Sequence, residues 1–519
     1  KFSVSPISSK ILLEGPMSKF NESGASSSYI ISYKNSYLNK TAPALYSYAG
    51  QQGLPFSFSD LYAKASFISS SGSKLNLFGF DFRDNVDYPQ TQYNWTSSGG
   101  GANFNIVPEG STIINGALGY SQYKMNQNEA DGKPRESSIN GFNININFSH
   151  FIGRDDIKYG IEMNGFSTDY NYTNTYGRLL KQEEFTTELS GFFRYKKNIG
   201  RLVIEPGLRI QAYASLSETT VEPRLAAKYN VSDKIRVKAA GGFYTQNLIS
   251  AVNDQDVVNL FYGFLSGPDN LPQTFKGETV NSALQKAWHY GAGIEFDLGQ
   301  HQEINIEGFY KDFTQLTNIN RDKLYDDDYL SKPEYQRSDY AREVGTSYGL
   351  DFRYKYEFKK IYIWAVYSLT YVTRDDGRRT YMPHFDRRHN INLVATYSFD
   401  KKRTWKLNTR WNYGSGFPFT QTQGNYEKYD PIKGGDPLTQ NGQIGTYFTD
   451  INTGRLPSFH RLDVSLSKKL TLKKNQSLTI TASATNVYNR ENIFYFDRKN
   501  LTRINQLPII PTVGINYSF

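Results

Sequence analysis

Runs of alternating apolar and polar side chains constrain the fold of this sequence more than any other feature. Between residues 142 and 148, three asparagines separate two phenylalanines and two isoleucines. An extended strand places alternate side chains on opposite faces, whereas a helix would distribute the asparagines around its circumference. The same alternation recurs at residues 235–239, 348–356 and 391–399. The pattern predicts an all-β protein whose strands each have one apolar face.

Composition favours a membrane barrel over a soluble sandwich for these strands. Hydrophobic residues make up 38% of the 519 residues, while 40 tyrosines raise the aromatic share to 15%. The small side chains between the apolar ones would barely fill a sandwich core. In a transmembrane barrel the apolar rows and aromatic girdles face lipid, and Asn, Thr, Lys and Glu line the interior. We therefore expect the apolar rows to face lipid. The sequence also contains no apolar stretch long enough for a membrane-spanning helix.

Short and long connections alternate along the chain, as they do in membrane barrels. Counting strands through this alternation gives about 22 antiparallel strands, an even number, from residues 2–7 to residues 509–519. We expect the short turns on the periplasmic side and the long loops outside. The predicted short connections are residues 69–72, 107–110, 153–156, 198–200, 231–233, 299–301 and 400–403. The predicted long connections include residues 248–284, 317–343 and 417–458.

The last nine residues form a strand pattern that ends on an aromatic side chain. The polar, glycine and two aromatic positions are Thr512, Gly514, Tyr517 and Phe519. This spacing resembles the β-signal by which outer-membrane proteins are handed to the barrel assembly machinery. An ordinary terminal strand is the alternative. The resemblance implies a location in the outer membrane of a Gram-negative bacterium.

Five short segments, taken in order, resemble the barrel of TonB-dependent receptors, particularly the SusC-related and carboxypeptidase-regulatory-like groups. They are residues 13–16 (LEGP), 54–56 (LPF), 221–225 (VEPRL), 386–389 (DRRH) and 486–492 (NVYNREN). The resemblance implies a 22-stranded barrel that holds a globular plug and imports a siderophore, glycan or peptide with energy from the TonB complex. A SusD-like surface lipoprotein or other membrane proteins would be further partners.

The plug of that family precedes the barrel, whereas this chain opens at the first predicted strand. We treat residues 1–519 as one outer-membrane barrel domain and expect the plug upstream of Lys1. Two alternatives stay open: another protein fills the lumen, or the barrel is a non-transporting scaffold within an assembly with surface lipoproteins. A soluble all-β binding protein is a third functional hypothesis.

Little in the sequence points to enzymatic chemistry. The chain has no cysteine and six histidines, of which only His384 and His389 lie close together, with Asp386 between them. A metal site would need further ligands, and an Asp–Arg pair at the membrane rim is the simpler interpretation. The glycines at residues 99–101 precede no helix that could bind phosphate, so they more simply bend a strand or leave room in the lumen. We expect no enzyme and no catalytic, cofactor-binding or metal-binding residue.

Two long loops contain candidate ligand-binding residues. In the first, Asp322 and the candidates Asp326, Asp327 and Asp328 could bind a hard cation, although they could equally be a solvated charge run. The second could hold a sugar or peptide by stacking and amide hydrogen bonds, but such loops are also common without a ligand. The candidates are Tyr325, Asp326, Asp327, Asp328 and Tyr329 in the first loop, and Gln421, Gln423, Tyr426 and Tyr429 in the second.

The excess of 59 Lys and Arg over 50 Asp and Glu gives a formal charge of +9. Outer Lys and Arg can pair with lipopolysaccharide phosphates. The inward-facing Arg236, Lys238, Arg353 and Lys355 could pair with carboxylates of a plug. Nucleic acid is disfavoured as a partner because the positive charges are scattered rather than gathered into one stripe.

Overall fold

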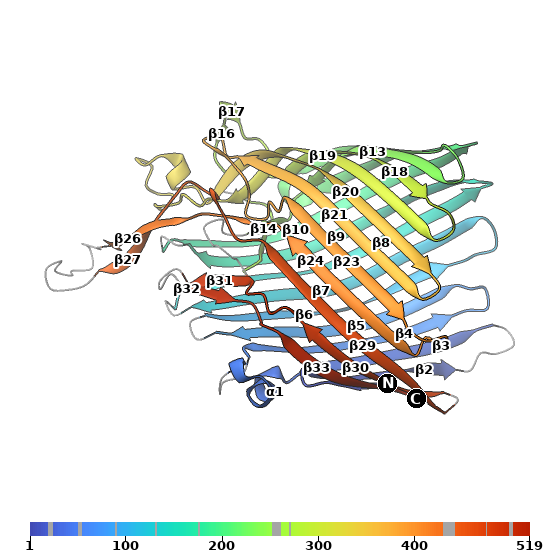
Figure 1. Cartoon of the computed structure of the whole chain (residues 1–519). Coiled ribbons are helices and arrows are strands. Elements are labelled where there is room, and N and C mark those ends of the chain that lie inside the picture. The colour runs from blue at the N-terminus through green and yellow to red at the C-terminus, as the bar shows by residue number, and fades with distance from the viewer. Residues whose placement is uncertain are drawn as a thin grey trace.

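The strands of the chain close into one antiparallel barrel (Figure 1). The computed structural model describes residues 1–18, 24–49, 54–88, 91–129, 132–174, 177–251, 261–268, 271–428, 442–473, 475–497 and 502–519. Within these ranges the main sheet has 23 strands, and one of them, the two-residue β22, only extends the pairing of β21. The other 22 are the staves of the barrel, which confirms the predicted number. Pairing of Phe2 with Tyr517 and of Val4 with Ile515 closes the ring.

The staves have the following bounds. They are β1 (Phe2–Val4), β2 (Ser8–Ser18), β3 (Ser26–Ser36), β4 (Phe56–Ile68), β5 (Lys74–Asp87), β6 (Thr91–Ile106), β7 (Thr112–Glu129), β8 (Arg135–Ile152), β9 (Asp155–Thr173), β10 (Leu179–Ile199), β11 (Leu202–Tyr213), β12 (Glu218–Asn230), β13 (Ile235–Gln246), β18 (Gln285–Asp297), β19 (Gln302–Ile319), β20 (Tyr340–Phe358), β21 (Ile361–Asp375), β23 (His389–Ser398), β24 (Trp405–Gly414), β29 (Phe459–Lys473), β30 (Gln476–Thr485) and β33 (Ile510–Ser518).

The remaining elements lie in the connections. They are β14 (Ile249–Ala251), β15 (Gly263–Leu265), β16 (Thr274–Phe275), β17 (Glu278–Thr279), β22 (Thr380–Tyr381), β25 (Pro418–Phe419), β26 (Thr422–Lys428), β27 (Gln443–Phe448), β28 (Gly454–Arg455), β31 (Ile493–Asp497), β32 (Thr502–Asn505), the helix α1 (Leu38–Leu45) and the short helices η1 (Ser47–Ala49), η2 (Ala214–Leu216) and η3 (Glu334–Gln336). None of the helices in the described part of the chain has both the length and the apolar character that a bilayer crossing requires.

The connections separate by length onto the two ends of the barrel. All seven predicted short connections join a strand to the next one at one end, and the three predicted long connections lie at the other end. The first predicted strand, residues 2–7, is longer than β1, because a turn at Ser5 replaces its second half. The Ser5 hydroxyl accepts hydrogen bonds from the backbone N–H groups of Ile7 and Ser8, and Pro6 has no N–H to pair.

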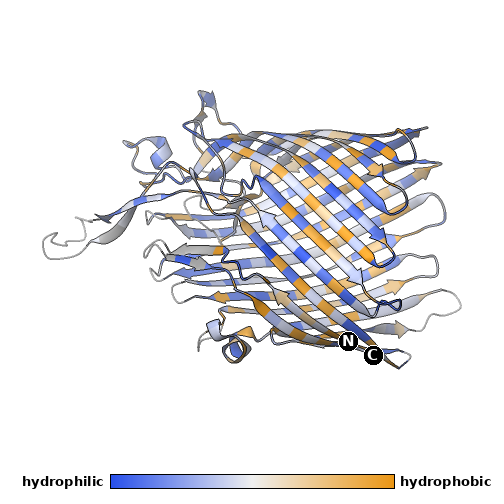
Figure 2. Cartoon of the chain, viewed as in Figure 1, coloured by the Kyte–Doolittle hydropathy of each residue, from blue (hydrophilic) through white to orange (hydrophobic). Residues whose placement is uncertain are grey.

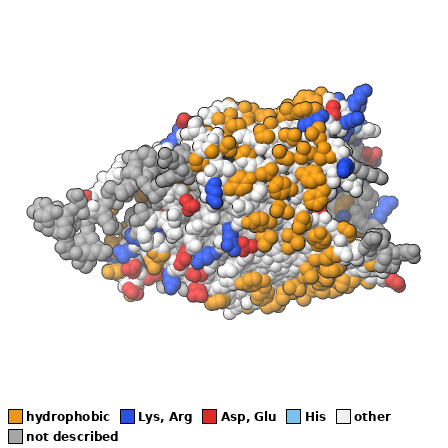
Figure 3. Space-filling model, turned by 90° about the horizontal axis from the view of Figure 1, so that it is seen from below, with side chains coloured by type: hydrophobic (Ala, Val, Ile, Leu, Met, Phe, Trp, Pro, Cys, Tyr) orange, Lys and Arg blue, Asp and Glu red, His pale blue; other side chains and the backbone are white. Residues whose placement is uncertain are grey.

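The apolar rows face outward, as the alternation predicts. Hydrophobic and polar residues alternate along the strands (Figure 2), and hydrophobic side chains gather on the outer surface of the barrel on the face that Figure 3 shows. Leu118 is 55% exposed, Ile144 50% and Ile161 59%. On the opposite face of β8, the Asn145 amide donates to Asn143, and the Asn143 amide donates to Asn164 on β9. An apolar outer surface around a polar interior is the arrangement of a membrane barrel.

The glycines at residues 99–101 lie in the middle of β6 and give room to aromatic rings. A Cβ on Gly99 would lie 2.9 Å from the ring of Phe80, and one on Gly101 would lie 3.2 Å from the ring of Phe78. These two glycines share their face of the strand with Asn103 and Asn105. They therefore leave room on the inner wall, as one of the two predicted interpretations requires.

Candidate ligand-binding site at the long-loop end

Part of the connection between β13 and β18 folds into the mouth of the barrel. We call residues 247–251 and 261–268 the inner segment. Its two strands pair, with Ile249 opposite Leu265. Ile249, Phe261 and Leu265 are buried in one apolar cluster with strand residues that include Tyr170 and Tyr172 of β9. The Phe261 ring centroid lies 5.2 Å from that of Tyr172, so the inner segment has a core of its own inside the barrel.

Polar contacts fix the inner segment to three neighbouring strands. The backbone N–H of Phe264 donates to the Ser137 hydroxyl on β8 at 3.0 Å. The hydroxyls of Thr168 on β9 and Ser266 lie 3.0 Å apart, and the Gln182 amide on β10 donates to the Ser266 carbonyl at 3.1 Å. Ser137 shares its face of β8 with the inward asparagines. The inner segment therefore rests on the inner wall and narrows the mouth.

The loop between β19 and β20, residues 320–339, reaches across to the tip of the β9–β10 hairpin. Asn174 donates to the Lys323 carbonyl at 3.2 Å, and Arg178 donates to the Leu324 carbonyl at 2.9 Å. The carboxylate of Asp326 lies 3.3 Å from the Arg178 guanidinium. This loop therefore covers part of the mouth next to the inner segment.

The predicted residues of this loop differ in their exposure to solvent. Asp326, Asp328 and Tyr329 are exposed, while Tyr325 and Asp327 are half-buried. The rings of Tyr325 and Tyr329 are 6.1 Å apart. Asp327 pairs with Lys323 at 3.6 Å. The two tyrosines form a small aromatic surface, and two of the three aspartates, Asp326 and Asp327, already have cationic partners.

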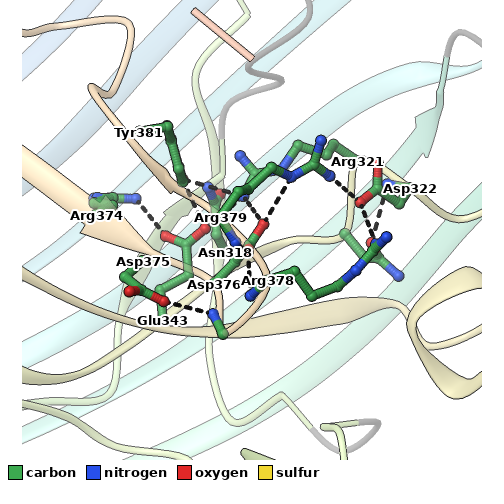
Figure 4. A network of polar contacts seen from close by, with 12 residues as sticks. Asn318, Arg321, Asp322, Glu343, Arg374, Asp375, Asp376, Arg378, Arg379 and Tyr381 are labelled. Atoms are coloured by element: carbon green, nitrogen blue, oxygen red, sulfur yellow. Dashed lines mark hydrogen bonds and ion pairs between the residues drawn. The ribbon is translucent and has the colours of Figure 1, made fainter. Parts of the chain in front are cut away.

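Asp322 belongs to a separate, partly buried network at the base of the same loop (Figure 4). It pairs with both Arg378, at 3.3 Å, and Arg379. Arg379 also pairs with Asp376 at 3.3 Å. Three of the four aspartates of this loop, Asp322, Asp326 and Asp327, thus pair with different cations instead of converging on one point. In the described ranges, no group of three or more His, Asp or Glu side chains could hold a metal ion.

The second predicted loop forms the β26–β27 hairpin, which projects away from the barrel (Figure 1). Gln421 and Gln423 are exposed at its base and along β26. The ring of Tyr426 lies 4.4 Å from that of Tyr447 on the partner strand. Tyr429 lies outside the described residues.

Residues 384–389 form a rim junction, as the simpler interpretation predicts. The buried Asp386 carboxylate accepts hydrogen bonds from Arg388 at 3.2 Å, Arg455 at 2.5 Å and the Val372 backbone N–H at 3.0 Å. The His389 imidazole lies 3.0 Å from the Tyr367 hydroxyl. Asp386 therefore links its own connection, between β21 and β23, to the connection between β24 and β29 and to the strand β21.

The inward-facing cations already have partners on the wall. Arg236 pairs with Glu295 at 2.9 Å and with Asp297, and Lys238 pairs with Glu295 and Glu307. Arg353 pairs with Glu303 and Lys355 with Glu357. The barrel wall itself thus supplies the carboxylates that the sequence interpretation assigned to a plug, from other strands for Arg236, Lys238 and Arg353 and from the same strand, β20, for Lys355.

Three residues of the terminal pattern, Thr512, Gly514 and Tyr517, lie on β33, the strand that closes the barrel, and Phe519 directly follows it. The Thr512 hydroxyl lies 2.7 Å from that of Ser483. A Cβ on Gly514 would lie 3.5 Å from the Val4 carbonyl oxygen of the first strand. The rings of Tyr517 and Phe519 are 5.8 Å apart. Their role as an assembly signal stays a prediction.

A closed barrel of 22 staves with an apolar outer band and a roofed mouth defines an outer-membrane transport barrel. A family model described as TonB dependent receptor-like, beta-barrel, matches residues 20–487. The chain belongs to this family, whose members are transporters and not enzymes. It is a protein of the Gram-negative outer membrane, so we call the long-loop end extracellular and the other end periplasmic.

Solved structures share the fold. The FrpB iron transporter from Neisseria meningitidis matches with a TM-score of 0.67 and 11% identity over 100% of this chain and 80% of its own. FpvA of Pseudomonas aeruginosa, bound to a heterologous pyoverdine, gives 0.64 and 11% over 100% and 71%. The unliganded ferric citrate transporter FecA gives 0.60 and 14% over 100% and 77%. No curated protein matches the chain.

Proposed function

We propose that this chain is the barrel of a TonB-dependent importer for a scarce nutrient, namely a siderophore, a glycan or a peptide. The observation that carries the proposal is the inner segment, whose apolar core and hydrogen bonds hold it against the inner wall beneath the extracellular loops. A mouth narrowed in this way suits selective capture better than free diffusion. The proposal includes a plug in the lumen and engagement of the TonB complex through it.

The proposal also assigns ligand contacts to the extracellular loops. Tyr325 and Tyr329 offer ring faces for stacking, and Gln421 and Gln423 offer exposed amides. We place the chain in the SusC-related group, with a SusD-like lipoprotein over the loops. The motifs at residues 13–16, 54–56 and 221–225 support this finer assignment.

Uptake by cells that lack the gene tests the proposal. Labelled ferric siderophores, glycans and peptides are supplied with and without a protonophore, which removes the energy source of TonB. We expect one ligand class to lose its protonophore-sensitive uptake in the deletion strain and to regain it with the wild-type gene. Complementation with a Tyr325→Ala and Tyr329→Ala double variant should restore less. Unchanged uptake of all three classes, together with stable co-purifying partners, would support the scaffold alternative instead.

A further inference from the structure

A cavity of about 260 Å³ lies among three extracellular connections. Its walls come from the β16–β17 hairpin, from the loop between β19 and β20 together with the first residues of β20, and from the turn at residues 376–378. Its lining includes seven charged side chains, two of which are Glu334 and Arg342, and the rings of Phe275 and Tyr335.

Contacts between these connections hold the walls of the cavity in place. Lys276 and Gly277 both have positive φ, of 52° and 86°, which gives the tight hairpin turn between β16 and β17. Lys276 pairs with Asp375 at 3.1 Å. A Cβ on Gly377 would lie 3.2 Å from the Phe275 ring, so the hairpin packs closely on the turn.

Arg342 differs from the other cations around the cavity. Lys276, Arg321 and Arg378 each have a carboxylate partner. In the described part of the chain the guanidinium of Arg342 has neither an ion pair nor a hydrogen bond, and its Nε atom is buried. Its contact is with the Phe275 ring, 5.8 Å away. A partly buried charge without an acceptor is costly, so this position favours an external anion.

Among the described residues, Arg387 is a second arginine near these loops whose guanidinium has no ion pair, but other side chains of the protein cover it. Arg387 also has a buried Nε without an acceptor. Its guanidinium, however, lies over the Phe417 ring at 4.0 Å and near the Phe459 ring at 5.9 Å. Protein side chains therefore cover Arg387, whereas Arg342 opens onto the cavity.

Glu334 supplies the opposite charge in the same cavity. Its carboxylate accepts a hydrogen bond from the Gln273 backbone N–H at 3.1 Å. Among the described residues it has no cationic partner. The cavity thus presents one unpaired cation and one unpaired anion, beside two aromatic rings.

We infer that this cavity binds a small zwitterion, namely a free amino acid or the end of a peptide. The planar guanidinium of Arg342 holds the ligand carboxylate through paired hydrogen bonds. The carboxylate of Glu334 holds the ligand ammonium. The Phe275 ring gives apolar surface to a side chain, beside the Tyr335 ring, which Arg378 already covers on one face at 3.7 Å. Binding needs only the folded chain, so the inference does not rest on the proposed import.

Calorimetric titration of the purified full chain in detergent tests the assignment with three probes. L-Phenylalanine carries both charges, N-acetyl-phenylalanine lacks the ammonium, and phenylalanine amide lacks the carboxylate. We expect saturable binding of L-phenylalanine at one site per barrel. Arg342→Gln and Glu334→Gln should each weaken this binding at least tenfold. N-acetyl-phenylalanine should bind weakly and be insensitive to Glu334→Gln, and the amide should be insensitive to Arg342→Gln.

The matched controls are Arg154→Gln and Glu109→Gln, which change exposed residues in periplasmic turns and should leave the affinity within twofold of the wild type. Loss of heat-modifiable mobility in gel electrophoresis would identify a variant that fails to fold. If Arg342→Gln fails to fold, the milder change Arg342→Lys replaces it. The inference is overturned by absence of saturable L-phenylalanine binding, by equal binding in Arg342→Gln, or by N-acetyl-phenylalanine binding as tightly as L-phenylalanine.

Discussion

Arg321 donates a 2.6 Å hydrogen bond to the carboxylate of Glu343, and the two side chains are only 4% and 0% exposed. The same carboxylate accepts hydrogen bonds from Tyr381 at 2.6 Å and Arg374 at 3.3 Å. One buried acceptor on β20 therefore anchors the base of the loop between β19 and β20 (Figure 4).

Replacing Glu343 by Ala should release that loop from the mouth. Removing one partner of a buried ion pair costs up to about 3–5 kcal/mol. Here Arg321 would lose its 2.6 Å bond to Glu343 and keep its longer pair with Asp376 at 3.6 Å. The barrel staves keep their own hydrogen bonds, so the loss is local. We expect faster limited proteolysis within residues 320–339 and an unchanged urea midpoint for the barrel. Asp81→Asn, which breaks the exposed Arg83–Asp81 pair, is the control. Cleavage at the wild-type rate would contradict this prediction.

Charges in the core of the inner segment should open the mouth. Ile249 and Leu265 are buried in the apolar cluster, and a buried carboxylate without a partner is strongly unfavourable. A double variant with Asp at both positions should therefore detach the inner segment. We expect higher single-channel conductance in planar bilayers than for the wild-type chain. The control is Leu330→Asp, at a position 78% exposed, which should leave the conductance unchanged. An unchanged conductance of the double variant would contradict the prediction that the inner segment is a constriction.

A lysine on the two faces of β8 should have opposite consequences. Ile144→Lys places a charge in the apolar band and should cost about 2–4 kcal/mol of folding free energy near mid-membrane. Asn145→Lys, one residue along, changes only the polar interior and should cost less than about 1 kcal/mol. Urea unfolding of the barrel in liposomes measures both. Equal costs for the two variants would contradict the assignment of faces.

The periplasmic turn between β23 and β24 should lose stability in acid. Hydrogen bonds from the backbone N–H groups of Trp405 and Thr404 and from the Thr404 hydroxyl lower the pKa of Asp400 to about 2. A depressed pKa means that the ionised form stabilises the fold. The stability that the ionised Asp400 gives the turn is present above the ordinary carboxyl pKa, near pH 4, and is lost as the pH falls toward 2.

Amide exchange of Trp405 and Thr404 between pH 4 and 2 checks this prediction. After correction for intrinsic rates, protection should fall with pH in the wild type and be low at all these pH values in Asp400→Ala. Asp233→Asn, in another periplasmic turn, should follow the wild type. Constant protection down to pH 2 in the wild type would refute the role of Asp400.

The sequence predicted the barrel and its faces because lipid imposes one rule on every strand. Apolar side chains at alternate positions, such as Ile144 and Ile146, must face outward together, and the asparagines between them must face inward. The short turns follow from the same pattern. The direction of each strand face and the position of each short turn depend on residues that are neighbours in the sequence, so local sequence patterns predict them.

The way in which the inner segment and the loop between β19 and β20 cover the mouth of the barrel could not be predicted from local sequence patterns. Ser137 and Phe264 meet although 127 positions separate them, and Asp322 meets Arg379 across 57 positions. Such contacts depend on how loops fold after the barrel has closed. Glu334 and Arg342 were not among the predicted site residues, because each looks like an ordinary surface charge. The Lys276-Gly277 turn is the one local signal that could have directed attention to this region.

Depth-dependent quenching at two adjacent positions of β7 tests the central claim, that apolar rows face lipid and polar rows enclose a lumen. The chain has no cysteine, so Leu118→Cys and Ala117→Cys each accept one fluorescent label without background. In liposomes, brominated lipids should quench the label at 118 strongly, and aqueous iodide should quench the label at 117. Strong iodide quenching at 118 with lipid quenching at 117, or equal quenching at both positions, would contradict the account.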